Sequence, residues 1–501
     1  MLFNSWLFIL VFMPVAVGGA FVLRRHLGPG ATVVWLGAAS LVFYAATSLE
    51  HLPLLLISII ANHAIASRMS LAQQSAQHSL RWLVVGLVFN LGALIAFKYA
   101  GFVMRITNDA LGTTLAIPAP GLPVGISFFT FTQVAYLVDM HARACRPHSG
   151  ANYLLFVSYF PHLVAGPILR HDETIRQFFG RRFATCVPAD MERGAALFAM
   201  GLAKKVLIAD SLAPYADATF LAADQGVQLS VWEAWLGLLS YTFQIYFDFS
   251  GYSDMAVGLS LMLGIDIPIN FRSPYKAASI IEFWRRWHIS LSNFLREYLY
   301  IPLGGNRLGK LRRNLNLMTT MILGGLWHGA GWGFIAWGAI HGACLVINHL
   351  WREHLSSRIN VPRFLGVSLT FLVVTLAWSF FRASTFDGAL NVIAGAAGLH
   401  GIALPQSMAG AEAVQKWLPW VHWSASGMLP NDLTESKPAW ASTVALAALI
   451  AWVAPNSVEL TRADSTSPQA LSRRTILAAG VLLAIALTML SRESPFLYFQ
   501  F

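Results

Sequence analysis

One short run, GGLWHGAGW at residues 324–332, constrains this chain more than any other feature. It places His328 inside a stretch from about residue 315 to residue 347 that contains no Asp, Glu, Lys or Arg. An ionisable side chain in hydrocarbon is costly and is usually functional, and histidine can accept and return a proton near neutral pH. His328 is therefore a candidate for chemistry within a membrane. A structural core histidine bonded to a backbone carbonyl is the alternative.

The composition supports a membrane protein. Of 501 residues, 56% are hydrophobic and only 12% are charged, whereas soluble domains carry about 25% charged residues. Apolar runs long enough to span a bilayer recur along the chain, and they are continuous rather than alternating, which favours helices over a barrel. We predict an all-α integral membrane protein with about 11 to 13 membrane helices, some re-entrant or broken. We expect one domain over residues 1–501, with its motifs between about 120 and 350.

The net charge of +10 comes largely from short basic loops, and this pattern is typical of cytoplasmic loops rather than of nucleic-acid binding. Basic loops at 24–25, 68–81 and 143–146 each follow an odd number of predicted spans, which places the N-terminus in the periplasm. Arg170 to Arg182 conflicts with simple alternation. Because Pro161, Gly166 and Pro167 lie just before it, we predict that segment 152–169 is broken or re-entrant.

Two further features complete this outline. Residues 399–438 are rich in proline and tryptophan, and we interpret them as a surface loop or a short helix at the membrane interface, with docking of a partner as the alternative. The three cysteines show no Cys-x-x-Cys spacing, so neither a disulfide framework nor a cysteine metal site is indicated. We predict no metal site.

The stretch from Ile281 to Tyr300 has the pattern of one amphipathic helix, with an apolar stripe every four residues. Its Glu282 and Arg286 are spaced to form an ion pair. His288 lies four residues after Trp284, so both would share one helical face. This makes His288 a second candidate, although an interfacial histidine near lipid phosphates would fit the same pattern.

Other polar residues within apolar runs need partners. Asp248 and Asp254 are costly in such a run unless they are paired, and we expect Arg285 and Arg286 to pair with them. His341 lies 13 residues beyond His328, so an unbroken helix would point the two apart and His341 would be a packing or supporting residue.

The sequence GGNRLGK at 304–310 resembles a P-loop only formally, because Leu311 replaces the required Ser or Thr and no strand precedes it. The basic residues in and after it could anchor the chain at the cytoplasmic face or attract an anionic donor; they are Arg307, Lys310, Arg312 and Arg313.

Several of these motifs, in this order, resemble the membrane-bound O-acyltransferase family, and most closely its bacterial alginate O-acetyltransferase branch. The resemblance covers about residues 125–345, close to half the chain, together with the C-terminal FLYFQF. It is carried by SYFPHLVAGPI at 158–168, FDFSGYSDMA at 247–256, WRRWHISLS at 284–292, YLYIPLGGNR at 298–307 and LWHG at 326–329.

The resemblance implies an acyl tunnel through the membrane, with His328 as the essential catalytic histidine and His288 as the second polar position. We expect Trp327, Trp284, Arg285, Asp248, Asp254 and His341 to support them. The implied donor is acetyl-CoA or another acetyl thioester, with no bound cofactor. The implied setting is the inner membrane, with periplasmic or membrane-anchored polysaccharide acetylation proteins as partners.

The expected reaction is therefore transfer of an acetyl group across the membrane for O-acetylation of an exported polysaccharide such as alginate. In this hypothesis a neutral, desolvated His328 acts as general base. Peptidoglycan or cellulose are alternative acceptors, and D-alanyl transfer to teichoic acid is a more distant one. A proton-coupled transporter would also fit the hydropathy and the intramembrane Asp and His residues.

Overall fold

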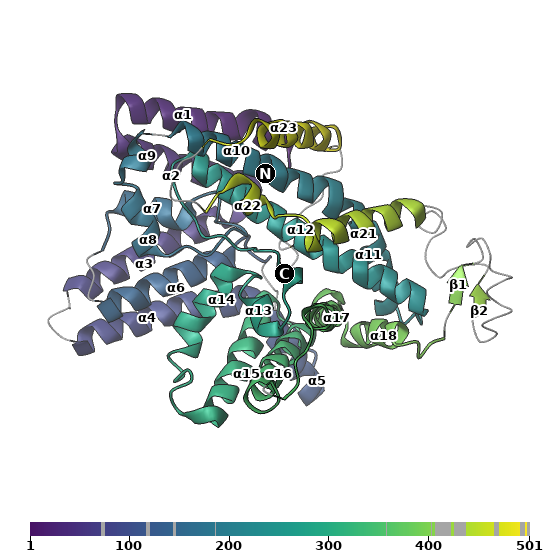
Figure 1. Ribbon diagram of the computed structural model, residues 1–501. Coiled ribbons are helices and arrows are strands. Elements are labelled where there is room, and N and C mark those ends of the chain that lie inside the picture. Colours follow the sequence, from purple (N-terminus) through teal and green to yellow (C-terminus); the bar gives the residue numbers. More distant parts are fainter. Residues whose placement is uncertain are drawn as a thin grey trace. The chain divides into compact units, whose positions relative to one another are not determined.

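The computed structural model describes residues 1–71, 76–116, 121–143, 147–185, 187–356, 358–401, 403–405, 422–424, 437–464, 470–490 and 496–497. Within these residues the regular secondary structure is helical apart from two three-residue strands, β1 (Ala403–Pro405) and β2 (His422–Ser424), which pair in parallel (Figure 1). The predicted all-α class is confirmed. Most of the predicted interfacial stretch 399–438 lies outside the described residues.

The chain forms two compact units. Unit 1 comprises residues 1–203, 251–270 and 457–501, and unit 2 comprises residues 204–250 and 271–456. Two of the boundaries fall inside continuous helical runs, after Ala203 and after Ser250. The single domain that we expect over the whole chain stays a prediction.

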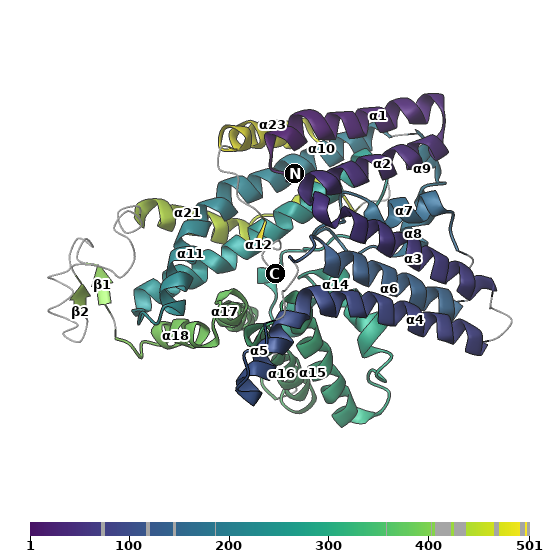
Figure 2. The ribbon, with the colours of Figure 1, turned by 180° about the vertical axis from the view of Figure 1, so that it is seen from behind.

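Unit 1 is a helical bundle. Its α3, α4 and α6 lie side by side (Figure 2), and α1 packs on α2. α23 packs on α10 through small side chains around Ala196, Ala199 and Ala479. The helical segments of this unit are η1 (Phe8–Phe12), α1 (Met13–His26), α2 (Pro29–Thr47), η2 (Leu49–His51), α3 (Leu52–Leu71), α4 (Ala76–Leu94), η3 (Ile95–Tyr99), α5 (Ala100–Leu111), α6 (Ile126–Arg143), α7 (Gly150–Ser158), α8 (His171–Gln177), α9 (Arg181–Thr185), α10 (Pro188–Ala203), the end of α12 (Val231–Met262), α22 (Ser457–Thr461) and α23 (Arg473–Thr488).

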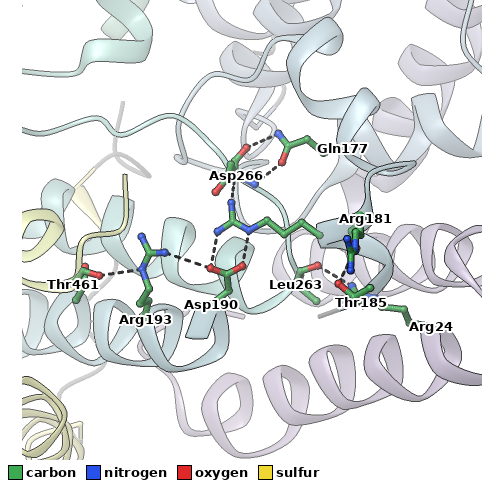
Figure 3. A network of polar contacts seen from close by, with 10 residues as sticks. Arg24, Gln177, Arg181, Thr185, Asp190, Arg193, Leu263, Asp266 and Thr461 are labelled. Atoms are coloured by element: carbon green, nitrogen blue, oxygen red, sulfur yellow. Dashed lines mark hydrogen bonds and ion pairs between the residues drawn. The ribbon is translucent and has the colours of Figure 1, made fainter. Parts of the chain in front are cut away.

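A network of charges, shown in Figure 3, joins α9 and α10 to the segment after α12. The Arg182 guanidinium donates to both oxygens of the buried Asp190 carboxylate and also pairs with Asp266, whose backbone carbonyl accepts from Gln177. Arg193 lies 3.5 Å from Asp190. Part of the basic stretch that conflicts with a simple alternation of spans is therefore neutralised inside unit 1.

Unit 2 is built around a helical hairpin. α15 (Gly309–His328) and α16 (Trp332–His354) run antiparallel, and α17 (Arg363–Arg382) packs on α16. The remaining helices and turns of this unit are η4 (Lys204–Ala209), α11 (Asp210–Asp224), most of α12, η5 (Pro274–Lys276), α13 (Ile280–Trp284), α14 (Ile289–Leu295), η6 (Arg296–Tyr300), α18 (Phe386–Ala396) and α21 (Lys437–Trp452).

Six helical runs in the described residues are long and apolar enough to cross a bilayer; they are Phe8–His26, Pro29–Thr47, Leu49–Ser70, Gln77–Leu111, Trp332–His354 and Arg363–Arg382. α12 is also long, at 32 residues, but polar side chains interrupt it and it is not among these six runs. The break that we predict in 152–169 is confirmed, because α7 ends at Ser158 and irregular chain follows it. The total of 11 to 13 segments stays a prediction.

Candidate functional site

His328 is placed by the turn of the α15–α16 hairpin. It is the last residue of α15, and three residues separate it from α16, of which Gly329 and Gly331 have extended backbone. The two helices approach so closely that a Cβ on Gly325 would lie 3.2 Å from the Gly338 Cα and nearer still to the Phe334 carbonyl oxygen. Glycine at both positions therefore lets α16 fold back along α15, and the 4%-exposed His328 is enclosed.

His288 comes from a strained turn rather than from the middle of a helix. The expected continuous helix over 281–300 is wrong: α13 ends at Trp284, and His288 is the N-cap of α14 with a left-handed backbone (φ 43°, ψ 55°). Such a conformation costs a non-glycine residue of order 1–3 kcal/mol and often occurs at functional sites. His288 and Trp284 therefore do not share one helical face, although the predicted Glu282–Arg286 ion pair is present at 2.8 Å.

The two histidines lie together in a buried box of aromatic rings. Their ring centroids are 6.4 Å apart, and the His288 ring also lies edge-on to Phe249, at 4.7 Å. The Trp327 ring lies near both imidazoles, with its centroid 6.3 Å from that of His288 and 4.9 Å from that of His328. The pair that the sequence singles out is thus brought together inside unit 2.

The hairpin also returns His341 to the site. Because the helix is broken after His328, the expectation that the two histidines point apart in one helix does not apply. The Trp337 ring lies 5.3 Å from His328 and 4.7 Å from His341, so one indole bridges the two imidazoles. Trp284 lies 5.3 Å from His341 and 5.8 Å from Trp337, so the three rings form one cluster. His341 is therefore placed in contact with the neighbours of His328, as a supporting residue would be.

Polar atoms of His341 and of the two indoles beside it lack hydrogen-bond partners among the described residues. Neither ring nitrogen of the fully buried His341 has a hydrogen-bond partner among the described residues, and the same holds for the indole N–H groups of Trp284 and Trp337. Buried polar groups in proteins almost always have a partner, and each exception needs an explanation. A bound molecule with polar groups, or ordered water, would supply the missing partners.

A pocket of about 450 Å³ opens beside Trp284 and His341. Trp284 belongs both to its wall and to the contact with His341. No acidic residue is among the described residues that line it, whereas Arg285, Arg296 and Arg352 are. Its lining residues are Ile281, Trp284, Arg285, Ile289, Ser292, Asn293, Leu295, Arg296, Tyr300, Leu317, Thr320, Met321, Leu345, His349 and Arg352. The pocket therefore suits an anionic molecule with an apolar or weakly polar arm.

The predicted donor-side residues are only partly free to attract an anion. Lys310 and Arg313 both pair with Glu353 at the end of α16, at 3.1 Å and 2.5 Å. Arg307 and Arg312 are exposed. All three arginines of the pocket wall lie outside residues 307–313, and only Arg285 is among the site residues predicted from the sequence.

The partners that we expected for the two aspartates are wrong. Asp248 pairs with Lys205 at 2.6 Å, and the same ammonium lies 2.8 Å from Asp210, so a buried charge triad forms in unit 2. In unit 1, Asp254 accepts a hydrogen bond from Ser457. The partners are distant in sequence, and Lys205 sits in the π-helical turn η4, for which the sequence holds no clear signal.

One group of possible metal ligands lies in unit 1, where Asp139, His171 and Asp172 approach one another. Arg143 donates to Asp172 at 2.6 Å and lies 3.8 Å from Asp139. Arg170 lies 3.6 Å from Asp172. Because arginines already oppose both carboxylates, this cluster is accounted for as a network of ion pairs.

Comparison with known proteins identifies the family of this chain. The model of the membrane-bound O-acyltransferase family matches residues 40–386, which include all three site histidines. The peptidoglycan O-acetyltransferase of Helicobacter pylori is 38% identical to this chain over 100% of it and 98% of that protein. A probable alginate O-acetylase (AlgI) of Pseudomonas aeruginosa is 41% identical over 77% of this chain and 73% of its own length. A teichoic acid D-alanyltransferase of Streptococcus thermophilus is 30% identical over 53% of this chain and 69% of its own length.

Proposed function

Because this chain belongs to the membrane-bound O-acyltransferase family, we propose that it carries an acetyl group from a cytoplasmic thioester across the membrane for O-acetylation of an exported polysaccharide. The observation that supports this most directly is the pair His288 and His328, 6.4 Å apart and buried in one aromatic box. The chain is a multi-pass membrane protein. Its place in the inner membrane, with a periplasmic N-terminus, is part of the proposal and rests on the basic loops.

The donor enters by the pocket beside Trp284. Acetyl-CoA carries phosphate groups, and the arginines at 285, 296 and 352 give the pocket a positive lining that attracts such an anion. The arm that bears the thioester then passes Trp284, towards His341 and Trp337. The unsatisfied nitrogens of these residues hold the polar groups of that arm. His341 is thus assigned as a positioning residue for the donor.

Transfer takes place at His328. Its imidazole takes the proton of the acceptor hydroxyl as the oxygen attacks the acetyl carbonyl carbon. A carbon–oxygen bond forms, the carbon–sulfur bond of the thioester breaks, and the proton passes from His328 to the departing thiolate. His288 orients the acceptor or donates a hydrogen bond to the carbonyl oxygen as negative charge develops there. General-base help of this kind contributes about 10²- to 10⁴-fold to the rate.

The acceptor that we place first is an alginate-like exopolysaccharide, in line with the 41% identity to the alginate O-acetylase of Pseudomonas aeruginosa. Peptidoglycan is the second candidate, because the Helicobacter pylori relative is similar over 98% of its length. In either case a periplasmic or membrane-anchored partner completes the transfer to the polymer. The acetyl group that leaves the tunnel is first carried on that partner or on an intermediate.

The test compares acetyl esters on the exported polysaccharide and on peptidoglycan in cells that lack the chain and then regain it. His328→Ala should leave the protein in the membrane but restore no acetylation. His354→Ala, an exposed histidine at the end of α16, is the matched control and should restore it fully. Acetylation restored by His328→Ala would contradict the role of His328. Esters that depend on the chain in peptidoglycan alone would replace the first acceptor with the second.

A further inference from the structure

A second concave surface in unit 2 is lined by residues of α17, α21 and the turn η5, and by none of the site histidines. It is an open groove of about 690 Å³, within the range typical of small-molecule sites. Its wall and floor are mainly apolar, and the rings of Phe371 and Trp452 meet at its base with centroids 4.8 Å apart. Its lining residues are Lys276, Arg363, Phe364, Val367, Ser368, Phe371 and Trp452.

One end of the groove carries positive charge without matching acid. The Lys276 ammonium donates to the Ala454 carbonyl at 2.7 Å, and the described residues give it no carboxylate partner. Arg363 lies 3.8 Å from Glu282, but that carboxylate also accepts from Arg286 at 2.8 Å. Among the described lining residues none is acidic. This end of the groove therefore has an excess of positive charge.

The charged end lies at the start of a membrane span. Arg363 is the first residue of α17, which is one of the six runs able to cross a bilayer. Phe364, Leu365 and Leu369 of this helix are 68%, 49% and 62% exposed, as expected for side chains that face hydrocarbon. Phe371 follows Arg363 by eight residues, or about 12 Å along the helix. The groove thus leads from the level of the lipid headgroups into the apolar region.

From this arrangement we infer that the groove binds one anionic phospholipid. Its phosphate lies between Lys276 and Arg363, and one acyl chain lies over Phe371 and Trp452. Basic pockets between transmembrane helices bind anionic headgroups in this manner, and each cation near the membrane surface contributes about 1 kcal/mol, or roughly fivefold in affinity. This site is independent of the proposed acetyl transfer, since it rests only on the span and on the groove's charge.

The test measures lipid binding to the full chain in detergent, by native mass spectrometry and by thermal unfolding. Phosphatidylglycerol and phosphatidylcholine with identical acyl chains are compared, and inorganic phosphate is a third arm. Phosphatidylglycerol should bind more tightly and raise the melting temperature more. Equal binding of the two lipids would overturn the proposal, and so would phosphate alone giving the whole stabilisation, because the acyl chain would then contribute nothing.

Two variants and a control locate the site. Arg363→Gln should weaken phosphatidylglycerol binding about fivefold, and because its side chain is 69% exposed, folding should be kept. Phe371→Ala should weaken both lipids. Arg358→Gln, an exposed arginine outside the groove, should change neither. Equal effects of the Arg363 and Arg358 variants would place the lipid elsewhere. If a helix of a partner protein filled the groove instead, that protein would stay bound to the chain when either lipid is added.

Discussion

Replacing Gly325 by alanine should separate the two helices of the hairpin that holds His328. The new Cβ would lie 3.2 Å from both the Cα and the nitrogen of Gly338, and it would collide with the Phe334 carbonyl oxygen. Ordinary contact begins near 3.4 Å, and the atoms in the way belong to backbone, which cannot rotate aside. Overpacking of this kind costs about 1–3 kcal/mol.

The neighbouring glycine provides a matched control. A Cβ on Gly324 would meet only the end of the Leu295 side chain, at 3.0 Å, and that side chain can shift. Both substitutions gain up to ~1 kcal/mol of helix propensity, so the difference between them isolates the helix crossing. Gly324→Ala should therefore be as stable as the wild type or more stable, and Gly325→Ala about 1–3 kcal/mol less stable than Gly324→Ala.

The same displacement should slow the reaction. Gly325 lies one helical turn before His328, and the helix that it would push away carries Trp337, 5.3 Å from that histidine. A misplacement of about 1 Å at reacting groups can cost ~10²-fold in rate. The assays are thermal unfolding in detergent and acetyl transfer in membranes at equal protein level. If the variants at 324 and 325 matched in both assays, the close helix contact would not position the site.

Three further predictions address other parts of the molecule. His341→Phe keeps a ring in the stack but removes two polar atoms; it should raise KM for the acetyl thioester about 2- to 10-fold at an unchanged melting temperature, and an unchanged KM would contradict donor positioning. Lys205→Met leaves two buried carboxylates without their shared cation, so it should lower stability by about 3–5 kcal/mol, and wild-type unfolding would contradict this. Burial raises the pKa of the Asp172 carboxyl, but the hydrogen bond from Arg143 and the charge of Arg170 outweigh burial and hold that pKa below its usual value of 3.8. The ionised Asp172 therefore stabilises the fold above its usual pKa, and this stabilisation is lost as the pH falls through the lower pKa of the folded state. Asp172→Asn lacks this contribution. Its melting temperature, measured from about pH 6 down to about pH 3, should fall less steeply at the acid end than that of the wild type.

Features set by short-range rules could be predicted from the sequence. Continuous apolar runs predict the helices, the Pro161–Pro167 region predicts the break after Ser158, and a spacing of four predicts the ion pair of Glu282 and Arg286. Each depends on residues within one or two helical turns of one another. Hydropathy is less informative for α12, where polar side chains lie inside a long helix.

The placement of the site could not be predicted in the same way. The apolar stripe from Phe283 to Leu295 continues through His288, so nothing in the pattern marks the left-handed residue that divides the helix. Lys205 and Asp248 are 43 residues apart, and only the packing of η4 against α12 joins them. His341 reaches the site because α16 folds back after Gly329, and that reversal depends on close contacts between glycines of two helices.

The two principal histidines occupy opposite kinds of helix end, and this supports different roles for them. His328 is the last residue of α15, a 20-residue helix whose C-terminal end carries partial negative charge. A general base gains positive charge when it takes the proton of the acceptor, and the end of α15 is a favourable place for that charge. His288 stands at the N-cap of α14, where the partial charge is positive and favours a neutral ring. A neutral ring can still donate one N–H to a developing oxyanion, so the backbone around each histidine is suited to the part proposed for it.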